Sequence, residues 1–282
     1  MPRRKTQGGA TSRRHVLTSS HCEYILKSMN QLIDRPDLSG PKVQNRIVDG
    51  EETTIEQYRF MANLEFSWQG VVWTSNCGGA IITTNAVLTA AHCPYGDQVS
   101  QWRVRAGSSA TASGGSIHQL SAIRIHPDYN RFQNDVAVLI LSNLLTVSPQ
   151  VGAARLAGAS YILPENSVVT ALGYGLLADA GDVSPSLKKI DVSISNQQAC
   201  IDLYEELKVT EPHWPTIGQG NVCTASNANG GSACNGDGGA PLVSENDIIY
   251  ALTSWGKNCN DDKYPIVNVL VPNYIDFIVG SV

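Results

Sequence analysis

The sequence predicts an all-β protein, and three observations favour this fold class. Val, Ile and Thr recur in short bursts, which is typical of strands. Gly, Asn and Ser break these bursts at short intervals, as turns between strands require. The chain has 282 residues with 42% hydrophobic content, enough for a buried core in one large or two small lobes. Many short strands are therefore expected, with few helices.

The strand pattern begins after residue 47 and runs through most of the chain. Each predicted strand is an apolar run bounded by turn residues. The predicted strands cover residues 80–91, 102–107, 135–141, 167–175, 188–194, 248–256 and 266–271.

Two segments depart from the strand pattern and are expected to be helical. Between Ser195 and Lys208, Ser195 and Gln198 have the spacing of a capping box, and the apolar residues that follow lie partly on one side. The second helix is the terminal segment 272–279, which is expected to pack on the preceding lobe.

Charge is divided unevenly between the first 46 residues and the remainder. Residues 1–46 carry nine Lys or Arg against three Asp or Glu, whereas the remainder carries eleven against twenty-two. The first segment is basic and without sustained periodicity, which is typical of a disordered leader or propeptide. The acidic remainder argues against a nucleic-acid partner, because such binding depends on Lys and Arg contacts with phosphate. No apolar run reaches membrane-spanning length, and a membrane partner is not expected.

Six of the seven cysteines lie in the acidic remainder, at positions 77, 93, 200, 223, 234 and 259, while Cys22 lies in the leader. An even count indicates a disulfide framework, although six cysteines allow fifteen pairings. No two cysteines have the close spacing of a zinc site. Disulfides imply an oxidising compartment, and we expect a secreted protein. The first 30 residues nevertheless lack the apolar run of a signal peptide.

Three short motifs carry a family resemblance. They are TAAHC at 89–93, NDVAVLIL at 134–141 and CNGDGGAPL at 234–242. In this order, His, Asp and a Gly-Asp-x-Gly loop resemble the chymotrypsin and trypsin family of serine proteases. The resemblance covers residues 47–282 and implies two packed antiparallel six-stranded β-barrels, at about 47–155 and 156–282, with a short C-terminal helix. It also implies a monomer that needs no cofactor.

The resemblance assigns a role to each motif residue. His92 takes the position of the general base and Asp135 that of the carboxylate that orients it. The backbone N–H groups of Gly236 and Gly238 match the oxyanion hole. RIVDG at 46–50 resembles the activation site, where cleavage after Arg46 would free the Ile47 amino group to pair with Asp237. The family's bridges imply the disulfides Cys77–Cys93, Cys200–Cys223 and Cys234–Cys259.

The position that should hold the nucleophile is Gly238, because the family pattern GDSGGP is matched here by GDGGAP. Glycine has no side chain, so no acyl-enzyme can form. Ala240 stands where the family has a glycine, and its Cβ is expected to crowd the loop. The sequence therefore predicts a catalytically inactive homologue of a protease.

The specificity pocket is matched by a further set of residues. Ser232 lies at the pocket floor without a carboxylate, which indicates apolar or aromatic ligands. Ile266 stands in place of a wall glycine and is expected to narrow the pocket. The expected pocket residues are Ser232, Ser254, Trp255, Gly256 and Ile266. Residues 98–127 contain no Asp or Glu, so the family's calcium site is not expected and no metal is predicted.

The sequence leaves three functions open. The first is an inactive homologue that binds proteins or peptides, among them protease inhibitors or active proteases. The second is an active chymotrypsin-like endopeptidase, if the true coding sequence carries serine at position 238. The third is a structural or storage module.

Overall fold

The computed structural model describes residues 50–176, 182–226, 231–233, 236–245, 247–258, 261 and 263–282. The leader with Cys22, the activation residues Arg46 and Ile47, and both Cys234 and Cys259 lie outside the described residues. The predicted domain boundary at residue 46 therefore stays a prediction.

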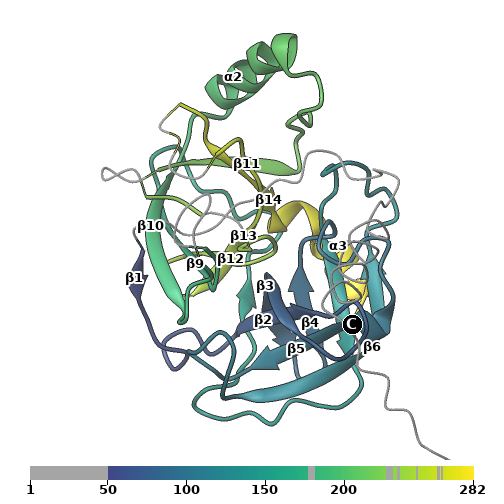
Figure 1. Cartoon of the computed structure of the whole chain (residues 1–282). Helices are drawn as coiled ribbons and strands as arrows, with labels where there is room; N and C mark the ends of the chain where they lie inside the picture. The colour runs from purple at the N-terminus through teal and green to yellow at the C-terminus, as the bar shows by residue number, and fades with distance from the viewer. Residues whose placement is uncertain are drawn as a thin grey trace, which may run out of the picture. The chain divides into compact units, whose positions relative to one another are not determined.

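The first barrel consists of six strands closed in the order β2-β3-β4-β7-β6-β5. The strands are β2 (Met61–Phe66), β3 (Thr74–Thr83), β4 (Ala86–Thr89), β5 (Trp102–Ala106), β6 (Ser116–Ile125) and β7 (Ala137–Leu141) (Figure 1). Strand β5 shows why this segment forms a strand, since Trp102, Val104 and Ala106 are buried while the arginines between them are partly exposed. This period of two matches the alternation of side chains across a sheet.

The second barrel also closes, because β9 pairs with both β10 and β12. The strands are β9 (Val168–Gly173), β10 (Lys188–Ile194), β11 (Asn221–Ala225), β12 (Pro241–Ser244), β13 (Ile248–Trp255) and β14 (Ile266–Leu270). Two short strands extend this sheet: β1 (Glu51–Glu52) pairs with β10, and β8 (Arg155–Leu156) runs parallel to β13. The predicted all-β class with two six-stranded barrels is confirmed.

One of the buried apolar clusters joins the two barrels. A single buried cluster contains Met61 and Leu88 from the first barrel together with Leu172, Val243 and Leu252 from the second. Burial of a Leu or Met side chain stabilises the folded state by about 1.5–3 kcal/mol. Burial of apolar side chains therefore stabilises the contact between the barrels as well as the interior of each barrel.

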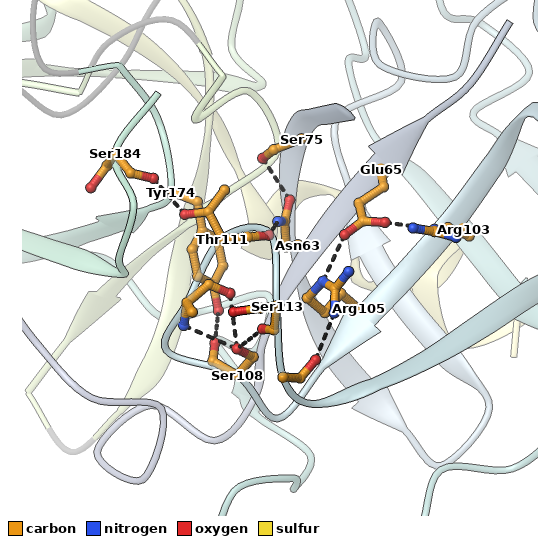
Figure 2. Close-up of polar contacts among 12 residues, drawn as sticks. Asn63, Glu65, Ser75, Arg103, Arg105, Ser108, Thr111, Ser113, Tyr174 and Ser184 are labelled. Atoms are coloured by element: carbon orange, nitrogen blue, oxygen red, sulfur yellow. Dashed lines mark hydrogen bonds and ion pairs between the residues drawn. The ribbon is translucent and has the colours of Figure 1, made fainter. Parts of the chain in front are cut away.

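Polar contacts also cross between the barrels (Figure 2). The Thr111 hydroxyl, from the first barrel, donates to the Ser184 carbonyl of the second at 2.5 Å, while the Asn63 amide holds the Thr111 carbonyl at 2.8 Å from within the first barrel. The Tyr174 hydroxyl donates to the Ser108 carbonyl at 2.7 Å. Because these atoms are buried, their pairing removes a desolvation cost that would otherwise oppose the contact.

A second polar cluster in Figure 2 lies on neighbouring strands of the first barrel. The buried Glu65 carboxylate accepts from Arg103 at 2.5 Å and from Arg105 at 2.7 Å. Glu65 faces Arg103 in the register of β2 and β5, so the strand pairing itself places the charges together.

Few helices are present among the described residues, as expected. Helix α2 spans Gln197–Thr210 and lies beside β11, to which the Cys200–Cys223 disulfide joins it (Figure 1). The chain ends in the 3-10 turn η2 (Val271–Tyr274) and the short helix α3 (Ile275–Gly280), and a further turn, η1, covers Val99–Gln101. No helix in the described part of the chain is long and apolar enough to cross a bilayer.

The start of α2 differs from the expectation. The N-cap is Asn196, whose side chain accepts from the Ala199 amide at 2.9 Å, and not Ser195. Ser195 donates its backbone N–H to the Cys223 carbonyl at 2.9 Å, so it still belongs to the strand side of the junction. The predicted capping box of Ser195 and Gln198 is therefore wrong, although the predicted helix is confirmed.

Candidate active site

An imidazole and a carboxylate are brought together by the pairing of β4 with β7. Thr89 is opposite Ala137 in this pair, so His92, just after β4, and Asp135, just before β7, lie at the same end of the two strands. The distance from His92 Nδ1 to Asp135 Oδ2 is 2.7 Å, and the His92 backbone N–H donates to Asp135 Oδ1 at 2.7 Å. Two contacts between the same residues fix the position and the tilt of the ring.

The carboxylate of Asp135 has a third partner, which comes from the second barrel. The Ser254 hydroxyl donates to Asp135 Oδ2 at 2.5 Å, while the Asp135 side chain is fully buried. Burial by itself raises the pKa of Asp135, but the charge and hydrogen bonds of His92 and the Ser254 hydroxyl outweigh it and hold the pKa below its usual value. An ionised carboxylate keeps the proton on Nδ1, so that Nε2 faces away from Asp135.

The residue that Nε2 faces is Gly238. A Cβ built on Gly238 would lie 2.5 Å from His92 Nε2 and 3.6 Å from Cys77 Sγ. The side-chain direction of residue 238 therefore points at the imidazole, as a nucleophile would. The polar contact of Nε2 is with Cys93 Sγ at 3.7 Å, and among the described residues no hydroxyl hydrogen-bonds to Nε2.

The loop that carries Gly238 is fixed to both barrels. The Gly238 carbonyl accepts from the Gly78 N–H at 2.9 Å, and the Gly239 N–H donates to the Thr253 carbonyl at 2.8 Å. Gly239 has a φ of 75°, and a Cβ there would come within 2.6 Å of the Ala90 nitrogen. Glycine is required at this position because an L side chain would meet both a strained backbone and a neighbouring chain.

Ala240 does not crowd the loop in the way its Cβ suggested. Its methyl group is fully buried, and a Cβ built on Gly78 would lie 2.5 Å from it. The glycine at position 78 thus provides the space that Ala240 fills. Gly78 was not among the site residues predicted from the sequence. The Gly-Gly pair at 78–79 could have indicated it, because glycine within a strand often marks a close approach of another backbone.

Asp237 lies beside Gly238 and is completely buried. One carboxylate oxygen, Oδ1, accepts from the Gly175 N–H at 3.1 Å. Gly173 passes so close to this carboxylate that a Cβ there would overlap it. The predicted pairing of Asp237 with the Ile47 amino group stays a prediction.

The expected pocket residues that can be placed are all buried. Ser232, Ser254 and Ile266 are each at most 3% exposed, and Trp255 and Gly256 are also buried. The Ser232 hydroxyl donates to the Ala233 carbonyl at 3.2 Å, whereas Ser254 points to Asp135. Their roles as a specificity pocket, and the narrowing by Ile266, stay predictions.

Two of the three expected disulfides are present, Cys77–Cys93 and Cys200–Cys223. The sulfurs of Cys77 and Cys93 lie near His92 Nε2, within 4.8 Å, but they are bonded to each other and offer no thiolate to a metal. The bridge joins β3 to the turn after His92 and so holds the imidazole against the barrel.

Two β-barrels joined by a buried apolar cluster, with a His–Asp pair from one meeting Ser254 and a glycine loop from the other, define the chymotrypsin class of serine protease fold. The sequence model of the family described as Trypsin matches residues 47–278. The chain belongs to the trypsin family.

Relatives in insects agree with this assignment. The chain is similar to "Trypsin, alkaline C" of Manduca sexta, with 38% identity over 244 residues, 86% of this chain and 93% of the relative. It is similar to Achelase-1 of Lonomia achelous, with 37% identity over 220 residues, 74% of this chain and 98% of the relative. Trypsin delta of Drosophila melanogaster is 33% identical over 245 residues, 86% of this chain and 90% of the relative.

Proposed function

We propose that this protein is a secreted member of the trypsin family that does not cut peptides and acts by binding protein or peptide ligands. The observation that carries the proposal is that the residue facing His92 Nε2 is Gly238, which has no side chain. His92, Asp135 and Asp237 are retained around it.

Peptide cleavage by this class of enzyme needs an attacking hydroxyl, which the general base deprotonates. At Gly238 there is no such atom, and His92 can act only on water. Removing the nucleophile of a comparable triad costs about 2 × 10⁶ in turnover, as measured in subtilisin. What is left is the capacity of this site to bind ligands.

Two other hydroxyls could be considered as substitutes. The Ser254 hydroxyl donates to Asp135, on the far side of the imidazole from Nε2, and the Ser232 hydroxyl donates to the Ala233 carbonyl. Neither hydrogen-bonds to Nε2. Since general-base catalysis requires hydrogen-bond reach, neither residue is positioned to replace a serine at 238.

The groups around the glycine support a binding role. A surface that has kept its buried pair and its loop contacts presents the shape to which inhibitors of proteases, or proteases themselves, are complementary. The two disulfides support a secreted protein, because such bonds persist in oxidising compartments. A monomer that uses no cofactor, metal or nucleic acid completes the proposal.

One experiment tests both halves of this proposal. The protein is cleaved after Arg46 and assayed with a peptide-substrate library, and its thermal stability is then measured with a panel of protein protease inhibitors. No turnover and a rise in stability with at least one inhibitor are expected, because a ligand selective for the folded state stabilises it. Turnover would overturn the proposal, and the absence of any stabilisation would favour a structural or storage module.

A second candidate function is an active trypsin-like endopeptidase. It is favoured by the names of relatives that are called trypsins, among them one 38% identical over 244 residues. This function requires a serine codon at position 238. Sequencing the coding DNA, together with the intact mass of the natural protein, decides between the two, because serine in place of glycine adds one CH₂O group.

A further inference from the structure

Three side chains with metal-ligating atoms meet beside Gly238, and two of them are joined in a disulfide. Cys77 Sγ, Cys93 Sγ and His92 Nε2 all lie within 4.8 Å of one another. Thiolate and imidazole groups are the ligands that Zn²⁺ prefers in proteins. While the disulfide is intact, its sulfurs are not thiolates and do not bind a metal.

The spacing of these atoms is close to that of a tetrahedral zinc site. With Zn–S bonds of about 2.3 Å and a Zn–N bond of about 2.0 Å, neighbouring ligand atoms lie about 3.6–3.8 Å apart. The distance from Cys93 Sγ to His92 Nε2 is 3.7 Å and already fits. The two sulfurs have to move apart, which rotation about the side-chain bonds provides once the disulfide is broken.

The imidazole of His92 is oriented as a metal ligand by the residue behind it. Asp135 Oδ2 lies 2.7 Å from Nδ1, so that Nδ1 carries the proton and the lone pair of Nε2 faces the sulfurs. A carboxylate in this position fixes the tautomer of a ligating histidine and makes the ring a stronger ligand. The buried negative charge of Asp135 also favours a cation on the other side of the ring.

Glycine at position 238 leaves the fourth coordination position open. A Cβ built on Gly238 would lie 2.5 Å from His92 Nε2 and 3.6 Å from Cys77 Sγ, on the side of the ring where a metal would bind. A serine side chain there would overlap the ion or its fourth ligand, whereas glycine leaves room for a water molecule. Three protein ligands with water in the fourth position are the arrangement of zinc sites that keep an open position.

We propose that reduction of the Cys77–Cys93 disulfide creates a Zn²⁺ site, with Cys77 Sγ, Cys93 Sγ and His92 Nε2 as ligands and a water molecule beside Gly238. The inference goes beyond the proposed function, which concerns the oxidised protein without metal. The two share only the glycine at position 238. Reoxidation to the disulfide would release the ion, so metal binding at this site responds to redox conditions.

The reductant is a dithiol, and the electrons and protons balance in two steps. A thiolate of the dithiol attacks one sulfur, and the Cys77–Cys93 bond breaks with its electron pair on the other sulfur. The second thiol of the reductant then displaces the first sulfur, which leaves two cysteine thiols and an oxidised, cyclic disulfide. Binding of Zn²⁺ replaces the two thiol protons, which pass to the solvent.

The Cys77–Cys93 bridge is the more accessible of the two disulfides in the described part of the chain. Cys77 and Cys93 are 5% and 6% exposed, whereas Cys200 and Cys223 are 1% and 0% exposed. Thiol–disulfide exchange requires access of the attacking thiolate to a sulfur. A limiting amount of dithiol should therefore reduce Cys77–Cys93 before Cys200–Cys223.

The test is a metal titration of the reduced, folded protein. The protein is treated with dithiothreitol without denaturant, desalted under nitrogen and titrated with Co²⁺, whose visible absorption identifies tetrahedral binding by thiolates. We expect one Co²⁺ per chain in the reduced protein, displacement of Co²⁺ by Zn²⁺, and no such absorption in the oxidised protein. Near-ultraviolet circular dichroism shows whether the fold is kept, and alkylation with peptide mapping shows which cysteines were reduced.

Variants identify the ligands. Cys77→Ala, His92→Gln and Gly238→Ser should each weaken Co²⁺ binding by about tenfold or more, because they remove a ligand or fill the fourth position. The matched controls Cys200→Ala, His118→Gln and Gly158→Ser should bind within about twofold of the parent protein, because they lie outside the site.

The inference is overturned if the reduced, folded protein gives no thiolate-bound Co²⁺, or if any of the three site variants binds as tightly as the parent protein. It is also overturned if reduction abolishes the near-ultraviolet signal and Zn²⁺ does not restore it, because the ligands are then no longer brought together. Peptide hydrolysis is measured separately on the oxidised protein, so a failure of the proposed function is distinguished from a failure of the metal site.

Discussion

Under the proposed function, the substitution Gly238→Ser should introduce peptide-cleaving activity, and the structure indicates how much. Loss of a nucleophile costs about 10⁶ in turnover, which is about 8 kcal/mol of transition-state stabilisation. The serine Cβ would lie 2.5 Å from His92 Nε2, whereas ordinary van der Waals contact begins at 3.4 Å. The distance between the two atoms must therefore increase by 0.9 Å, which displaces the imidazole. A misplacement of about 1 Å costs about 10². The expected gain is therefore about 10⁴-fold in kcat/KM.

The assay is hydrolysis of a peptide substrate by the variant after cleavage at Arg46. Gly158→Ser is the matched control, because a Cβ at Gly158 meets no atom within 4 Å, and it should leave turnover at the background level. Thermal unfolding shows whether each variant is folded. A gain below tenfold in a folded Gly238→Ser protein would refute the assignment of position 238, and a gain near 10⁶ would refute the steric argument.

Three further predictions concern stability. Gly239→Ala should lower the free energy of unfolding in urea by about 3 kcal/mol, because φ is 75° and the new Cβ meets backbone atoms; a loss below 1 kcal/mol would contradict this. Glu65→Gln should cost about 3 kcal/mol by leaving two arginines without their carboxylate, whereas the exposed control Glu51→Gln should cost under about 0.5 kcal/mol; equal effects would be incompatible with the argument. The low folded-state pKa of Asp135 contributes stability that is present above the ordinary Asp pKa of about 3.9 and lost as pH falls through the folded value. The free energy of unfolding of Asp135→Asn should therefore fall less steeply at acid pH than that of the parent protein. Parallel curves for the two proteins would show that Asp135 does not contribute to the pH dependence of stability.

Local patterns predicted only part of the strands. The predictions matched β5, β7, β9, β10, β13 and β14, but β2, β6, β11 and β12 were not predicted, and the range 80–91 contains the end of β3, a turn and the whole of β4. In β5, buried Trp102, Val104 and Ala106 alternate with partly exposed arginines, and this alternation is visible in the sequence. The beginning of α2 was harder to predict, since Ser195 and Asn196 are both good N-cap residues. The hydrogen bond from the Ser195 N–H to the Cys223 carbonyl keeps Ser195 outside the helix and leaves Asn196 as the N-cap. This bond could not be predicted locally, because Cys223 lies far from Ser195 in the sequence.

The candidate site was predicted from the order of its sequence motifs and not from local sequence patterns such as periodicity. No periodicity indicates that His92 and Asp135 meet, and only the resemblance to a family related them. The contact of Ser254 with Asp135 and the fit of Ala240 against Gly78 depend on packing between the barrels. Such close approaches require the three-dimensional arrangement, so the space around Gly238 could not be judged from the sequence.

The proposed function requires that the site around Gly238 offers no atom that can attack a carbonyl or a phosphonate, and covalent labelling measures this. Protein with a verified glycine at position 238, cleaved after Arg46, is incubated with an excess of a fluorophosphonate and its intact mass is measured, with Gly238→Ser as the positive control. We expect that the mass of the parent protein stays unchanged while the variant gains one adduct. An adduct on the parent protein that maps to the residues around His92 and Gly238 would contradict the proposed function.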